Sequence, residues 1–145
     1  MSEPTLNKTK TMSTKQQTIL VVDDDMDYLL QLETMLKKMG FRVETAESQK
    51  EGEDKLEKVK PDLAIVDLMM ENMDSGFILS RKIKQRYPEV PVVIATAVTS
   101  ETGMIFGLDT EEEKQWIKAD LYLEKGLRED QLHREITRLL KQAGR

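Results

Sequence analysis

Four short apolar segments of this chain are each followed by side chains that could take part in phosphoryl chemistry. These side chains are Asp23, Asp24, Asp25, Asp67, Thr96 and Lys125. Several carboxylates brought together repel one another and are costly to bury, unless a cation offsets their charge. Mg²⁺ suits such a cluster because it takes oxygen ligands and accepts phosphate oxygens in its remaining positions. With a lysine and a hydroxyl to bind other phosphate oxygens, these residues fit phosphoryl transfer to a carboxylate.

The segments that carry these residues predict the sheet that must bring them together. Five short runs with strand character alternate with longer amphipathic stretches, and they cover residues 19–22, 42–45, 63–66, 92–95 and 121–123. This alternation is typical of βα units around a parallel sheet covered by helices on both faces. The first, third and fourth runs are nearly uniformly apolar, so we expect them to be the central strands. Ligands of such sheets bind beyond the carboxyl ends of the strands, where the strand order reverses.

Helical spacing of apolar residues predicts the connecting elements. A first stripe ends at Gly40, two further helices end before Pro61 and Pro88, and a last stripe covers the carboxyl-terminal part of the chain. The residues of the first and last stripes are Leu29, Leu32, Leu36 and Met39, then Leu132, Ile136, Leu139 and Leu140. Thr110 and Glu113 form a capping box that begins another helix. We therefore predict the α/β class, as a (βα)5 doubly wound parallel sheet in three α/β/α layers.

Length and composition restrict the remaining classes of function. The chain has 145 residues, enough for one domain, and 22 basic against 27 acidic residues give it a net charge of −5. This acidic balance disfavours nucleic acid and anionic membranes as partners. The chain has no cysteine, no apolar run near the roughly 18 residues of a membrane span and no secretory signal, so we expect a cytoplasmic location. Residues 1–17 are a polar tail, and residues 18–145 form the domain.

Four motifs of the chain resemble the receiver domain of response regulators in two-component signalling, similar to the stand-alone chemotaxis type. The motifs are ILVVDDD at 19–25, DLAIVDLMMENMDSG at 62–76, VVIATA at 92–97 and LYLEK at 121–125. The resemblance covers residues 18–142 and implies the flavodoxin-like strand order 2-1-3-4-5. It implies a response regulator that accepts a phosphoryl group from a histidine kinase or phosphotransfer protein, rather than an enzyme with a separate substrate.

The resemblance also implies a role for each candidate residue. Asp67 resembles the phosphoacceptor. The positions implied to hold Mg²⁺ are Asp23, Asp24, Asp67 and the backbone carbonyl of Met69. Thr96 and Lys125 resemble the pair that binds phosphoryl oxygens, and Tyr122 resembles the aromatic switch that turns inward when Thr96 is drawn to the phosphoryl group. The resemblance implies a downstream protein target and allows a phosphorylation-dependent dimer.

Four features depart from the usual receiver pattern. Glu71 stands where a proline is usual, four residues after the phosphoacceptor, and Met-Asp-Ser-Gly at 73–76 has one residue more than usual. Gly126 stands in place of the proline that usually follows the lysine. The stretch from Thr96 to Lys125 is also longer than usual, with the excess around residues 99–111. We expect a reshaped loop after the third strand and, since nothing follows the last helix, an output through protein contact.

Two other functions are consistent with the same residues. A small phosphohydrolase of the haloacid-dehalogenase type would use Asp23 as nucleophile and Asp25 as the second carboxylate of a D-x-D pattern. A receiver-like scaffold would bind partners without phosphorylation. Asp25 also fits a simpler role as the N-cap of the first helix.

Overall fold

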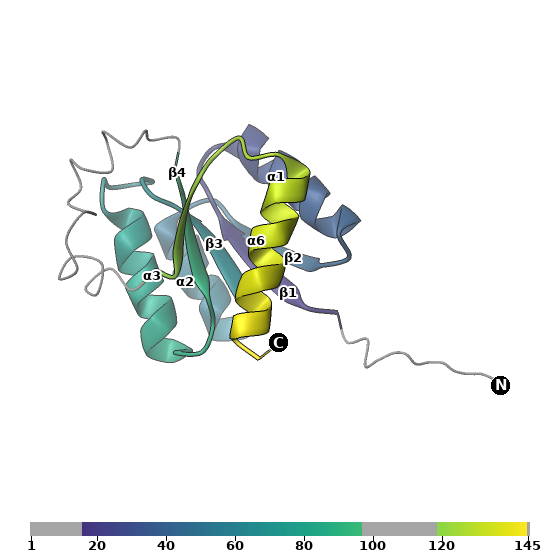
Figure 1. The fold of residues 1–145 in the computed structure, drawn as a ribbon. Helices are drawn as coiled ribbons and strands as arrows, with labels where there is room; N and C mark the ends of the chain where they lie inside the picture. Colours follow the sequence, from purple (N-terminus) through teal and green to yellow (C-terminus); the bar gives the residue numbers. More distant parts are fainter. Residues whose placement is uncertain (1–15, 97–118, 145) are drawn as a thin grey trace.

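The computed structural model describes residues 16–96 and 119–144 of the chain, which form a five-stranded sheet with helices on both faces (Figure 1). The strands are β1 (Thr18–Val22), β2 (Arg42–Ala46), β3 (Leu63–Asp67), β4 (Val92–Thr96) and β5 (Leu121–Glu124). The helices are α1 (Met26–Lys38), α2 (Gln49–Lys58), α3 (Ser75–Arg86) and α6 (Glu129–Gln142). The fourth expected helix, with Thr110 and Glu113, and the long stretch at 99–111 lie outside the described residues.

The sheet is parallel throughout, with the strand order β2-β1-β3-β4-β5. This order confirms the sequence prediction, including the central position of β1, β3 and β4. Val22 at the end of β1 is paired with Ala46 in β2 and with Val66 in β3. Because the register is in step, the residues that follow β1 and β3 emerge side by side at the carboxyl edge. The strand order reverses between these two strands, which is where a sheet of this kind binds its ligand.

Alternate residues of the central strands supply the two hydrophobic cores. In β1, Ile19 and Val21 belong to the core beneath α1 and α6, whereas Leu20 and Val22 belong to the core beneath α2 and α3. The two helix pairs lie on opposite faces of the sheet (Figure 1). All four side chains are at most 2% exposed, as expected of a strand covered on both faces. The central strands are therefore fixed firmly enough to hold polar groups at their ends.

Local capping signals determine where α1 begins and ends. Asp25 is its N-cap, and the Asp25 Oδ1 atom accepts hydrogen bonds from the backbone N–H groups of Asp27 and Tyr28. The helix ends just before Gly40, whose φ of 97° lies in the left-handed region that glycine adopts without strain. Just before β1, the Gln17 carbonyl accepts a hydrogen bond from the N–H of Arg42, the first residue of β2. None of the helices in the described part of the chain is long and apolar enough to cross a membrane.

Gly76 allows α3 to begin directly against the end of β3. Its N–H donates to the Leu68 carbonyl at 2.9 Å. A Cβ atom at this position would overlap the Asp67 carbonyl oxygen and would lie 2.7 Å from the Leu68 Cα. These neighbours are backbone atoms, which have little freedom to move away. The backbone next to Asp67 is thus shaped by a close approach that only glycine permits.

We expect Gly76→Ala to lower the free energy of unfolding by about 3 kcal/mol, the upper end for overpacking of a core. Gly52→Ala is the matched control. Its added Cβ would lie 2.8 Å from Leu79 Cδ2 and 3.2 Å from Val22 Cγ2, which are ends of side chains that can turn. We expect a smaller loss there, because these side chains can move away from the added methyl group whereas the backbone atoms around Gly76 cannot. Urea unfolding of both variants tests this order, and equal losses would contradict it.

Candidate functional site

Two buried carboxylates face each other at the carboxyl edge of the sheet. Asp23 follows β1 and Asp67 ends β3, and their exposed fractions are only 1% and 7%. The Asp23 N–H donates to the Ala46 carbonyl at 3.1 Å, and the Asp23 Oδ1 atom accepts from the Asp25 N–H at 2.9 Å. Backbone hydrogen bonds therefore fix Asp23 in orientation. Its second oxygen remains for a cation.

Lys125 supplies the positive charge that these carboxylates require. The Lys125 Nζ atom lies 2.7 Å from Asp23 Oδ2 and 3.1 Å from Asp67 Oδ1. The residue follows β5, and its N–H donates to the Thr96 carbonyl at 2.7 Å, which ties the loop to the end of β4. One ammonium thus bridges the ends of β1 and β3 from the far side of β4. The sequence predicts that Lys125 reaches this edge, but not that it pairs with Asp23.

Asp24 completes a group of three carboxylates that could hold a metal ion. Asp23, Asp24 and Asp67 each place one oxygen within 4.8 Å of the others, and Asp24 is exposed to solvent. An all-oxygen donor set with one side open to water fits Mg²⁺, which prefers carboxylates and retains several waters. The donor set therefore matches the magnesium site expected from the sequence. The side chain of Met69, two residues past Asp67, is 40% exposed.

Electrostatics at this edge favours the protonated form of Asp67. Burial and the negative charge of Asp23 raise the pKa of the Asp67 carboxyl from 3.8 to about 7, although Lys125 acts to lower it. Burial acts to lower the pKa of Lys125, but the hydrogen bond to Asp23 and the charge of Asp67 raise it overall. The lysine therefore stays charged, and the carboxylates remain only partly compensated. A further cation is needed for all of them to be ionised together.

Tyr28 is a member of the site that sequence reasoning missed. The Lys125 Nζ atom lies 4.8 Å from the centroid of the Tyr28 ring, within the range of a cation–π interaction. Tyr28 belongs to the first turn of α1, where its N–H is bound by the Asp25 cap. The sequence places Tyr28 three residues after the expected N-cap Asp25, which predicts its position in the first turn of the helix. Its contact with Lys125, however, depends on the tertiary structure.

Thr96 and Tyr122 lie on the two strands nearest Lys125. Thr96 ends β4 and is half-buried, and it is paired with Glu124 of β5. Tyr122 packs against the small core formed by Leu68, Phe77 and Ile94. Its buried hydroxyl has no hydrogen-bond partner within residues 16–96 and 119–144, and burial raises its pKa to about 12. The aromatic ring expected to act as a switch is thus turned inward in this structure.

The departures from the receiver pattern have visible structural results. Gly126 has a φ of 94°, which proline cannot adopt because its ring fixes φ near −65°. The additional residue at 73–76 is accommodated by Ser75, which is fully buried and accepts a hydrogen bond from the Asn72 N–H at 3.0 Å. Asp25 is engaged as the helix cap. This is the simpler role that the sequence allowed for Asp25.

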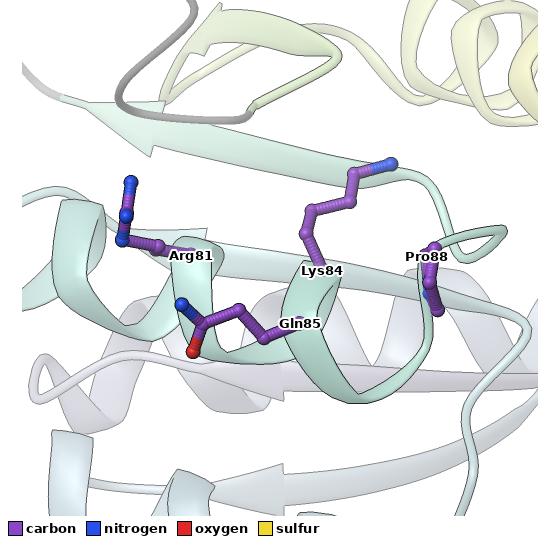
Figure 2. Close-up of a pocket in the computed structure, with 4 residues that line it drawn as sticks. All are labelled: Arg81, Lys84, Gln85 and Pro88. Carbon is purple, nitrogen blue, oxygen red and sulfur yellow. The ribbon is translucent and has the colours of Figure 1, made fainter.

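A hollow beside α3 is separate from this site. Arg81, Lys84, Gln85 and Pro88 line a cavity of about 290 Å³ beside the carboxyl-terminal half of α3 (Figure 2). Lys84 forms an ion pair of 2.7 Å with Asp120, which precedes β5 at the amino edge of the sheet. The hollow thus lies away from the strand ends that carry Asp23, Asp67 and Lys125.

A doubly wound five-stranded sheet with an Asp–Asp–Lys cluster at its switch point defines the receiver class of signalling proteins. The family model of the response regulator receiver domain matches residues 19–137. The chain therefore belongs to the response regulator receiver domain family, which confirms the resemblance seen in the sequence. Phosphoryl acceptance, Mg²⁺ binding at an acidic pocket and interaction with histidine kinases or phosphotransfer proteins are the general properties of this family.

Individual relatives agree with this assignment. The transcriptional regulatory protein GltR of Pseudomonas aeruginosa is 34% identical over 134 residues, which cover 91% of this chain and 52% of GltR. The alkaline phosphatase synthesis transcriptional regulatory protein PhoP of Bacillus subtilis is 28% identical over 86% of this chain and 49% of its own length. This chain thus spans about half the length of these relatives. A CheY-like receiver from Methanospirillum hungatei has a TM-score of 0.77 at 25% identity, covering 90% of this chain and 98% of that one.

The raised pKa of Asp67 predicts that the metal-free protein loses stability as the pH rises. Between about pH 4 and pH 7 the folded state keeps the Asp67 proton that the unfolded state has released. The folded state binds more protons in this window, so the free energy of unfolding falls with increasing pH. Within residues 16–96 and 119–144, the charged groups that face Asp67 are Asp23, Asp24 and Lys125. Urea unfolding in EDTA across this range should show a smaller fall for Asp67→Asn.

Asp54→Asn is the control for this measurement. The Asp54 side chain is 61% exposed and pairs only loosely with Lys50, at 3.8 Å. We expect it to leave the pH dependence of the wild type unchanged. An Asp67→Asn variant with the same slope as the wild type would contradict the prediction.

The Tyr28 ring should stabilise Lys125 through its π face. We expect Tyr28→Phe to keep this interaction and Tyr28→Leu to lose about 0.5–2 kcal/mol, the range of cation–π pairs. The ring also shields the nearby protons of Lys125, so the NMR signals of its ε-methylene should move downfield in the leucine variant alone. Equal stability and equal shifts in the two variants would show that the ring acts only by its bulk.

Proposed function

We propose that this chain accepts a phosphoryl group on Asp67 from a phosphohistidine of a histidine kinase or phosphotransfer protein. The observation that carries the proposal is the Lys125 ammonium, which lies 2.7 Å from Asp23 and 3.1 Å from Asp67 at the switch point of the sheet. Asp24 opens the same group of carboxylates to solvent. A buried nucleophile, a fixed cation and an open acidic edge are what transfer to a carboxylate requires.

The proposed transfer gives each of these side chains one role. An Asp67 carboxylate oxygen forms the new O–P bond, while the P–N bond of the donor histidine breaks and its electron pair returns to the imidazole. Lys125 and Thr96 bind two of the phosphoryl oxygens. Mg²⁺, held by Asp23, Asp24, Asp67 and the Met69 carbonyl, would offset the charge of the incoming phosphate. The chain thus modifies only its own aspartate, so we propose that it is not an enzyme with a separate substrate.

We further propose that Tyr122 reports the phosphorylated state. Its hydroxyl is buried without a hydrogen bond in the described structure, and such an unsatisfied group costs about 1–3 kcal/mol. This cost keeps the inward orientation from being strongly preferred, so that a shift of Thr96 toward the phosphoryl group can alter the balance between orientations. The surface around β5 then changes, and a downstream protein or a second copy of the chain reads the change.

Intact mass after incubation with acetyl phosphate and Mg²⁺ tests the proposal. We expect the wild type to gain one phosphoryl group and Asp67→Asn to gain none. Excess EDTA should abolish the label, because phosphate cannot approach this acidic edge without a dication. Asp25→Asn is the matched control: asparagine is as good an N-cap as aspartate, so this variant should be labelled like the wild type.

Three results would contradict the proposed function. Labelling of Asp67→Asn at the level of the wild type would place the phosphoryl group elsewhere. Full labelling in EDTA would remove the role of the metal. A wild type that takes no label but still binds partner proteins would favour the scaffold alternative.

A further inference from the structure

Glu71 joins the loop after β3 to the first turn of α2. Its Oε1 atom accepts a hydrogen bond from the Gln49 N–H at 2.8 Å, and its Oε2 atom accepts one from the Lys50 N–H at 3.2 Å. Both donors belong to a helix that begins 22 residues earlier in the chain. One carboxylate therefore spans two separate elements of the fold.

These bonds complete the cap of α2 instead of duplicating it. The first N–H groups of a helix have no partner within the helix, and a negative charge near them is favourable. The N-cap Ser48 serves the next donor, since its Oγ atom accepts from the Glu51 N–H at 3.1 Å. Gln49 and Lys50 receive their acceptors from Glu71 alone among the described contacts. The start of α2 thus depends on the loop that follows Asp67.

The rest of this loop is bonded mainly to itself. The Asn72 carbonyl accepts from the N–H groups of Met70 and Ser75, each at 3.2 Å, and Ser75 Oγ accepts from the Asn72 N–H. Met70 packs against the core beneath α2 and α3. Glu71 lies within this loop. It is two residues from Met69, whose backbone carbonyl is implied to bind Mg²⁺.

The helix that receives Glu71 is itself well anchored. Two ion pairs connect α2 to α3, Glu53 with Lys82 at 2.8 Å and Glu57 with Arg86 at 2.9 Å. Leu56 and Gly52 of α2 are buried against the sheet. Movement of the loop around Met69 is therefore opposed by an element that cannot easily follow it.

We propose that Glu71 is a positioning residue, which holds the Met69 segment against the N-terminus of α2 and so couples the Mg²⁺ site to that helix. The inference rests on the proposed function, since it concerns the metal site beside Asp67. Binding of Mg²⁺ at the site is then sensed by the Gln49 and Lys50 amides, although neither residue touches the metal.

Titration of the full chain with Mg²⁺ alone, followed by amide NMR, tests this coupling. In the wild type the Gln49 and Lys50 signals should shift as Mg²⁺ binds. Glu71→Ala should weaken Mg²⁺ binding about tenfold, the low end for groups that orient a metal ligand, because the Met69 segment loses its attachment to α2, and should abolish the response at both amides. Glu71→Gln should restore part of the affinity, because its amide oxygen still accepts a hydrogen bond.

Glu51→Ala is the matched control. The Glu51 Oε1 atom accepts from the Glu47 N–H at 2.8 Å, so this carboxylate also caps the start of α2 but makes no described contact with the loop. We expect Glu51→Ala to destabilise the helix end and to leave the Mg²⁺ affinity within about twofold, since it leaves the attachment of the Met69 segment to α2 intact.

The outcomes separate the alternatives. Equal affinities in Glu71→Ala and Glu51→Ala would overturn the proposal and leave Glu71 as a helix cap only. A wild type whose Gln49 and Lys50 amides do not respond to Mg²⁺ would also overturn it, even if the alanine variant failed to fold. Failure of the proposed function would appear differently, as a wild type that binds Mg²⁺ with this response but takes no phosphoryl group on Asp67.

Discussion

The repulsion between the Asp23 and Asp67 carboxylates is the constraint on which the rest of this structure depends. Two buried negative charges at neighbouring strand ends are unfavourable by themselves, and Lys125 compensates them only in part. Strands β1 and β3 end at the same level of the sheet, so the two carboxylates lie close together. The loop after β5 places Lys125 beside them. The fold therefore holds incompletely compensated negative charge in place, which a bound dication can offset.

Most of the fold could be predicted from the sequence because its determinants are local. The apolar runs of β1, β3 and β4 identify buried strands, and the positive φ of Gly40 matches its predicted place at the end of α1. The two cores follow from alternation along the strands. The tight fit of Gly76 could not be predicted, since the backbone atoms that exclude a side chain there come from β3 and the residue after it.

The main residues of the candidate site could also be predicted from the sequence. Residues that follow parallel strands share one edge, so the meeting of Asp23, Asp67 and Lys125 could be expected from their positions alone. Tyr28 and Glu71 could not be recognised in this way. Each acts on an element distant in the sequence, Tyr28 on the loop after β5 and Glu71 on the start of α2. Contacts of this kind carry no periodic signal.

The backbone at Gly126 separates this chain from receivers that have a proline after the lysine. Its φ of 94° and the value near −65° required by proline lie in different basins of the Ramachandran map. A single exchange of one residue for the other therefore changes the path of the chain as well as a side chain. Gly126→Pro would therefore redirect the backbone that follows Lys125, because a φ of 94° is closed to proline.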